Sequence, residues 1–305
     1  MLALIEARLT ALSSDARRVL RAASIFGNVF WSGGVQALVG PAGALDVPGY
    51  LAELGARELV ARRAPPLFAG EEEYVFRDAR VREAAYEMLT EEDRALGHRL
   101  AAAWLEAQGE RTPSLLGEHH ERGGDREQAV RWFSLAAHDA LSSDDFEAAL
   151  VWTERAVTCG AAGEARGKLD LVRAEVHRWR GEHAAAERWA GRAMERLPRG
   201  SAPWFRAAGE HVAASGRVGN TEEVLTVATA IGETPGDAAT VAARTGAVAR
   251  AVMHLLWAGR FEQAEALLRT VGGHDEELSR TDPDVVAWVF RARALRASFA
   301  GFPGA

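Results

Sequence analysis

The sequence predicts a mainly α-helical protein in which a small α+β unit precedes an α-solenoid of stacked helical hairpins. Three observations support this fold class. One pattern, a turn residue, several polar residues, a small apolar residue and then a large one, occurs five times between residues 124 and 267. Each copy places its apolar residues at helical spacing. Two strand-like runs, 58–63 and 73–78, lie ahead of the repeats. Arrays of stacked helical pairs bind other polypeptides on their curved faces.

The first expected element is an amphipathic helix at residues 2–12, and either Ser13 or Ser14 is the expected cap of a second helix. Between Arg21 and Asp46 the chain carries no charge. This stretch holds several glycines and a proline, together with polar amides, which make poor membrane-spanning material. We therefore interpret it as a buried turn with short helices.

A helix near 48–57 leads into the two strand-like runs, which predict a β-hairpin with Tyr74 and Phe76 on one face. Three helices followed by a hairpin is the layout of a winged helix. Further helices are expected at 79–89 and 92–108. We divide the chain into a winged-helix-like unit, 1–92, and a solenoid, 93–305.

The repeats justify the helices that follow. Small residues let neighbouring helices approach closely, while the large residues between them fill the remaining gaps. Pro198 is expected to end one of these helices. The copies begin at Gly124, Asp144, Gly181, Gly219 and Gly259. The predicted buried stripes are Ala129, Trp132, Phe133, Ala136, Ala137 and Ala140; Ala186, Trp189, Ala190, Ala193, Met194 and Leu197; Val224, Val227, Ala228 and Ile231; and Ala264, Leu267, Leu268 and Val271.

The third copy resembles the second half of a tetratricopeptide repeat. Gly181, Ala186, Ala193 and Pro198 stand at the matching positions, and the resemblance extends over roughly residues 95 to 305. The first helix of that unit keeps only a small residue of the family pattern, and the spacing near 38 residues exceeds the usual length of roughly 34. We describe the array as degenerate tetratricopeptide-like repeats.

The last segment of the sequence predicts the first half of another repeat. Asp282 is the expected cap of its helix, with Pro283 in the first turn. Gly301 then stands where Gly259 stood one repeat earlier, and the sequence ends at Ala305 without a second helix. We expect the solenoid to be truncated at its carboxyl end; the alternative is a natural end with a frayed helix.

Two stretches resemble the region that follows the nucleotide-binding domain in bacterial signal-transduction ATPases of the STAND class. They are IEARLTALSSDARRVLRAASIFGNVFW at 5–31 and VFRDARVREAAYEMLTEEDRALGHRLAAAWLE at 75–106. Family members commonly carry a histidine where this chain has Asp78. The resemblance implies an upstream P-loop ATPase, often fused to a serine/threonine kinase or nucleotide cyclase. It implies that this chain is a non-catalytic scaffold or sensor segment of such a protein.

The residues themselves do not predict an enzyme. The only lysine, Lys168, follows Gly167, but Ala162 occupies the required earlier glycine of a P-loop and Leu169 replaces its Ser or Thr. The protein kinase signatures are also missing. The sequence therefore indicates no catalytic residue and no cofactor for this chain, although the parent polypeptide could be an ATPase, kinase or cyclase.

No metal site is predicted either. His119 and His120 lie beside glutamates, but neighbours on a helix point about 100° apart, unlike the two histidines of a zinc helix. We interpret them as part of a solvated helix end. Cys159, the single cysteine, lies at the end of an apolar face and is interpreted as a small core residue. With one cysteine and no signal peptide pattern, we expect a cytoplasmic protein.

Charge disfavours nucleic acid as a partner. Residues 1–95 hold 11 Arg and no Lys against 14 Asp and Glu, and the whole chain carries a net charge of −7. Arg62 and Arg63 on the hairpin are a local exception. They leave open an alternative function, a DNA-binding transcriptional regulator with an effector-sensing repeat domain. No membrane partner is expected.

The favoured partner is a protein or peptide held in a groove lined by the first helix of each hairpin. The alignment with the tetratricopeptide family implies eight groove-facing residues. They are Arg131, Ser134, His138, Glu175, Arg178, Arg206, Glu210 and Arg291.

Overall fold

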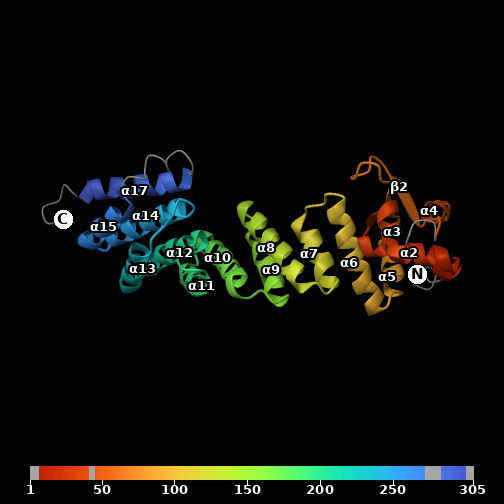
Figure 1. Ribbon diagram of the computed structural model, residues 1–305, viewed down its shortest axis with the longest axis horizontal. Helices are drawn as coiled ribbons and strands as arrows, with labels where there is room; N and C mark the ends of the chain where they lie inside the picture. Colours follow the sequence, from red (N-terminus) through yellow and green to blue (C-terminus); the bar gives the residue numbers. More distant parts are fainter. Residues whose placement is uncertain (1–6, 41–44, 272–282, 300–305) are drawn as a thin grey trace. The chain divides into compact units, whose positions relative to one another are not determined.

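A computed structural model describes residues 7–40, 45–271 and 283–299 (Figure 1). The chain is mainly helical, as predicted, with one small three-stranded sheet. It forms two compact units, Met1–Phe133 and Ser134–Ala305. The predicted boundary at residue 92 differs from this division, because two further helices and the start of a third join the first unit.

Unit 1 is built of short helices around the sheet. Ser13 caps the first complete helix, its hydroxyl accepting a hydrogen bond of 3.1 Å from the Ala16 amide. Residues 7–10 ahead of it are helical, and the rest of the expected first helix lies outside the described residues. The elements are α2 (Ser14–Phe26), β1 (Val29–Trp31), α3 (Ser32–Val39), α4 (Val47–Ala56), β2 (Val60–Arg63), β3 (Glu73–Phe76), α5 (Ala79–Glu87), α6 (Glu91–Ala107) and α7 (Pro113–Arg122).

The sheet contains the predicted hairpin and one strand that the sequence did not reveal. Its order is β1-β3-β2, and both pairings are antiparallel. Phe30 of β1 packs on Tyr74 and on Phe76, with ring centroids 5.7 and 5.2 Å away, so these two residues share a face as expected. The uncharged stretch therefore includes a strand, β1, in place of turn and helices alone.

The boundary lies later than predicted because α6 contributes to the core of unit 1. Trp104 of α6 packs against Phe26, Trp31 and Phe68, with ring centroids 5.6 to 5.7 Å away. Large aromatic side chains dominate the energetics of a core. Leu116 of α7 is also fully buried in the same cluster. The stretch 75–106, which resembles part of the STAND-class ATPases, therefore ends inside unit 1.

The interpretation of His119 and His120 as part of a solvated helix end is wrong. Both side chains are buried, at 4% and 9% exposure. Nε2 of His120 lies 2.9 Å from a carboxylate oxygen of Glu106, and the Trp132 indole donates to the same oxygen at 3.3 Å. Polar partners from other helices compensate the burial of the imidazole. The helix carries its histidines into the protein because α6 covers this face.

Unit 2 repeats one helix length at a constant interval. Helices α10, α12 and α14 each have 17 residues and begin at Gly163, Ala202 and Val241, which are 39 residues apart. Helix α8 (Arg126–Ser142) spans the division between the units. The other elements are α9 (Phe146–Thr158), α10 (Gly163–Trp179), α11 (His183–Arg196), α12 (Ala202–Val218), α13 (Thr221–Glu233), α14 (Val241–Trp257), α15 (Phe261–Leu268), η1 (Arg269–Val271) and α17 (Pro283–Phe299).

Helices α9 to α15 pack in chain order, and α12 also packs against both α10 and α14 (Figure 1). Helix α12 contacts α10, α11, α13 and α14, and α14 contacts α15 and α17. Most residues of the predicted stripes are buried, and Ala186, Ala190 and Ala193 have no exposed surface. Ala140, Met194 and Leu268 are only half-buried, contrary to the prediction. Trp189 was predicted to be buried but is only half-buried. The guanidinium groups of Arg173 and Arg192 both lie over its ring.

Most predicted helix ends agree with the structure. Helix α11 ends at Arg196, just ahead of Pro198. Pro283 lies at the start of α17. Cys159 is buried, as expected of a small core residue. The expected cap Asp282, together with Gly301 and Ala305, lies outside the described residues.

Candidate partner-binding site

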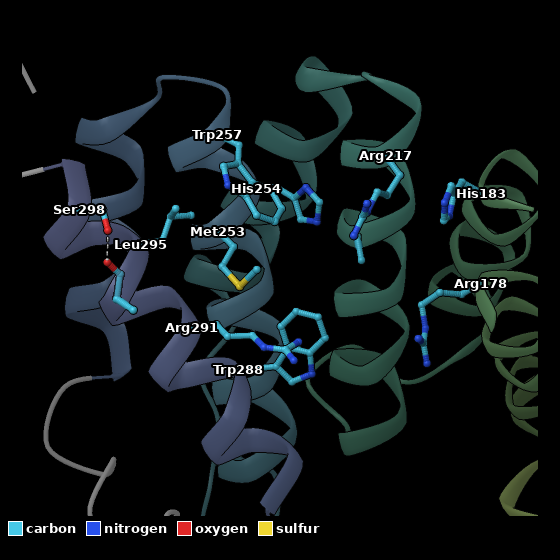
Figure 2. Close-up of a pocket in the computed structure, with 12 residues that line it drawn as sticks. Arg178, His183, Arg217, Met253, His254, Trp257, Trp288, Arg291, Leu295 and Ser298 are labelled. Carbon is cyan, nitrogen blue, oxygen red and sulfur yellow. Dashed lines mark hydrogen bonds between the residues drawn. The ribbon is translucent and has the colours of Figure 1, made fainter. Parts of the chain in front are cut away.

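Unit 2 contains a hollow of about 600 Å³ between its successive helices, which we call the main hollow (Figure 2). Helices α10, α11, α12, α14 and α17 supply its walls. The volume falls in the range of pockets that hold small molecules or several peptide residues. The lining residues are Arg178, His183, Ala213, Arg217, Met253, His254, Trp257, Trp288, Arg291, Ala294, Leu295 and Ser298.

Two arginines occupy the same position within two helices of equal length. Arg178 and Arg217 are both the penultimate residues of 17-residue helices, α10 and α12. Helices of equal length in consecutive repeats present equivalent positions to the same side of an array. Arg178 lies at one side of the main hollow and Leu295 at the other, with Arg217 between them (Figure 2).

A second, smaller hollow of about 350 Å³ shares one residue with the first. Trp288 of α17 lines both. The smaller hollow also receives Arg206 and Arg250, from α12 and α14, among otherwise apolar or small residues. Two hollows with a common wall form an elongated surface across α12, α14 and α17.

The carboxylate of Glu210 contacts two of the lining arginines, Arg178 and Arg250. Its side chain is 4% exposed, and its carboxylate lies 2.6 Å from Nε of Arg178 and 2.5 Å from a terminal nitrogen of Arg250. The second contact is a hydrogen bond, whereas the N–H of Arg178 is not aligned with its oxygen. A buried carboxylate between two guanidinium groups fixes their positions but costs desolvation.

Glu175 is a second, half-buried carboxylate beside these arginines. It lies 4.0 Å from Arg206, a longer contact than those of Glu210. Burial, and then the nearby charge of Glu210, raise the pKa of Glu175 above its ordinary value. The two carboxylates therefore lie close enough to repel each other.

Two arginine side chains lie over the ring system of Trp288. The guanidinium of Arg250 lies 4.8 Å from the ring centroid and that of Arg291 lies 5.4 Å away. Such contacts contribute about 0.5–1 kcal/mol at exposed sites. They hold Arg291 beside the main hollow while its side chain stays exposed.

His254 lines the main hollow, and its imidazole is neutral at physiological pH. Its side chain is buried, and burial, followed by the charge of Arg217, lowers its pKa to about 4. The ring occupies space left by Gly216, where a Cβ would lie 2.0 Å from Nδ1. Its other ring neighbour is Trp257, at 5.1 Å between centroids. Trp257 as a whole residue is 53% exposed.

Positive charge dominates both linings. Arg217 and Arg291 have no carboxylate partner among the described residues. The described linings of the two hollows together hold five arginines and no aspartate or glutamate. In a chain of net charge −7 this is a local reversal of sign. The arrangement suits an anionic ligand with apolar groups.

The structure brings together five of the eight residues that the sequence singled out. Arg178 and Arg291 line the main hollow, Arg206 lines the smaller one, and Glu175 and Glu210 lie next to these arginines. The other three, on α8, line neither hollow: Arg131 lies over the Trp132 ring and bonds Gln128, Ser134 is half-buried, and His138 is exposed.

Sequence reasoning missed Arg217, Arg250, Trp257 and Trp288. A signal for the first was present, because Arg178 and Arg217 are 39 residues apart, which is the interval between helix starts. Helical periodicity identifies a buried face, but it does not separate an aromatic residue that fills a core from one that lines a hollow.

The arginines of the hairpin are engaged within unit 1. Arg62 forms a salt bridge of 2.8 Å with Glu72, and Arg63 lies 3.4 Å from the buried Glu73. On α4, Arg57 pairs with Glu53 at 3.0 Å. Phosphate binding by these arginines would have to compete with the carboxylates.

Asp78, the residue that departs from the family histidine, has a local role. It caps α5, its carboxylate accepting from the Arg80 amide and pairing with the Arg80 side chain. These bonds lower the pKa of Asp78. An aspartate at this position begins a helix.

The described residues show neither a metal site nor a membrane-spanning helix. No group of His, Cys, Asp and Glu side chains there has the arrangement of a metal site. Among the same residues, no helix is sufficiently long and apolar to cross a bilayer. In comparisons with known proteins, no family model, curated protein or solved structure matched this chain.

Proposed function

We propose that this chain is a non-catalytic binding segment whose unit 2, a degenerate tetratricopeptide-like α-solenoid, holds a protein or peptide in the two hollows. The observation that carries the proposal is the elongated cationic and aromatic surface formed by successive repeat helices. Sequential packing of α10 to α15 and the constant 39-residue interval support the solenoid. A polypeptide is favoured because the two hollows share Trp288 and together extend over α12, α14 and α17.

The proposal extends to the cellular context. The resemblance of 5–31 and 75–106 to STAND ATPases supports a cytoplasmic bacterial signalling protein, with unit 1 as a winged-helix-like module and an ATPase or kinase upstream. We do not propose DNA binding, because Arg62, Arg63 and Arg57 already have carboxylate partners.

A display library of random peptides tests the binding function. We expect selection on the protein to yield peptides whose binding is lost in Ala294→Trp, because the new indole fills the main hollow from an exposed position on α17. Ala184→Trp, at an exposed position of α11 that lines neither hollow, is the matched control. Selected peptides that bind wild type and Ala294→Trp equally would refute the hollows as the site.

A further inference from the structure

We propose that the bound segment is an extended acidic peptide that contains an apolar or aromatic residue, a specificity that rests on the proposed function. The first argument is the state of the arginines. Arg217 and Arg291 face a hollow without a carboxylate among the described residues to neutralise them. A ligand that supplies carboxylates would give these guanidinium groups charge-assisted hydrogen bonds.

The spacing of the arginines indicates several single charges on one extended chain. Arg217 belongs to α12 and Arg291 to α17, and α14 packs between these helices. Packed helices lie roughly 8–10 Å apart, and an extended chain advances roughly 3.3 Å per residue. Carboxylates several residues apart in a strand-like peptide can therefore meet both arginines. A compact anion with its charges on one group would reach only one of them.

The apolar residues of the main hollow indicate which other side chain the peptide contains. Met253, Leu295 and the exposed indole of Trp257 line the same hollow as the arginines. A peptide of carboxylates alone would leave this surface in contact with water. An apolar side chain between acidic residues would cover it, and burial of such area contributes roughly 25 cal/mol per Å².

The existing ion pairs indicate which arginines should contribute most to the affinity for an acidic peptide. Glu210 already binds Arg178 and Arg250, so a ligand carboxylate would share these two guanidinium groups with a buried partner. Arg217 and Arg291 do not have that competitor. We expect them to contribute most to the affinity for an acidic ligand.

Fluorescence anisotropy with labelled peptides of equal length tests the specificity. The probes are a glutamate-rich peptide with a central phenylalanine and its glutamine-rich and lysine-rich counterparts. We expect the first to bind most tightly, the second weakly and the third not at all, with affinity for the first falling as salt is added. Arg217→Gln and Arg291→Gln should each raise its dissociation constant about tenfold. Arg188→Gln, at an exposed position of α11 that lines neither hollow, should leave it unchanged.

Two further measurements distinguish a failure of the acidic specificity from a failure of the proposed binding function. A single-stranded oligonucleotide of matched charge that binds more tightly than the glutamate-rich peptide would overturn the assignment in favour of nucleic acid. Library peptides that require the main hollow but are neutral or basic would overturn the acidic specificity and leave the binding function intact. Peptides that bind independently of Ala294→Trp, with no effect of either arginine change, would overturn both.

Discussion

At the scale of single residues, the most unusual contact in unit 1 is a buried pair of histidines. Nδ1 of His98 lies 3.0 Å from Nδ1 of His119, and Nε2 of His98 lies 2.9 Å from the Tyr86 hydroxyl. Only one proton fits between the two Nδ1 atoms, so at least one ring must be neutral for the bond to exist. Burial lowers the pKa of His98 to about 3 and that of His119 to about 4.

This pair predicts that unit 1 loses stability as the pH falls below 6.5. Both pKa values are lowered in the folded protein, so below pH 6.5 the unfolded chain binds protons that the folded chain does not. Each histidine should then cost about 1.4 kcal/mol per pH unit until its folded pKa is reached. Hydrogen exchange of α6 and α7 between pH 6.5 and 4 measures the slope. His98→Gln should reduce it by about half, with exposed His138→Gln as control.

Gly117 on α7 makes a second residue-scale prediction. A Cβ at this position would lie 2.6 Å from two ring atoms of Phe133, which is fully buried. Gly117→Ala should therefore lower the free energy of unfolding by roughly 1–3 kcal/mol. Gly55→Ala, in α4, meets no atom within 4 Å and should be neutral or stabilising by at most about 1 kcal/mol. Urea unfolding of the two variants compares them, and equal stability would contradict the prediction.

At the scale of elements, the α10–α11 hairpin is held by a buried carboxylate. Asp170 has no exposed surface, and its oxygens lie 3.1 Å from Nε of Arg166 and 3.1 Å from a terminal nitrogen of Arg196. Arg173 lies 3.8 Å away. One aspartate thus joins two arginines of α10 to one at the end of α11.

Removing this carboxylate should separate the two helices. Asp170→Ala leaves partly buried guanidinium groups without their partner, and such losses typically cost about 3–5 kcal/mol. Glu164→Ala on the same helix removes only an exposed pair with Lys168 and should cost less than about 1 kcal/mol. Thermal unfolding of unit 2 checks the difference. A similar effect of both changes would show that the Asp170 network does not stabilise the hairpin.

The sequence predicted those elements whose signal is local. Periodic apolar residues identified α11 and α13, the serines at 13 and 14 indicated the start of α2, and alternation identified the hairpin. The misses depend on partners distant in sequence. Strand β1 is three residues long and is specified by its pairing with β3. His119 is buried because α6 covers it, and Arg217 became a site residue only when α14 and α17 formed the opposite wall.

At the scale of the whole molecule, two separate cores account for the stability. One cluster gathers buried residues of unit 1, from Leu9 to Trp132, and another gathers those of unit 2, from Leu171 to Ala292. The proposed binding surface belongs entirely to the second unit. A change that weakens one core should therefore leave the protection of the other unit intact.

Hydrogen exchange on Gly117→Ala and Asp170→Ala tests this separation in the full chain. We expect the first change to accelerate exchange in α6 and α7, because Gly117 packs against Phe133, a fully buried residue of unit 1. The second should accelerate exchange in α10 and α11, where the Asp170 network lies. In each variant the helices of the other unit should exchange as in wild type, because local openings follow cooperative units. Acceleration spread evenly over α6, α7, α10 and α11 in either variant would mean that the two units unfold as one.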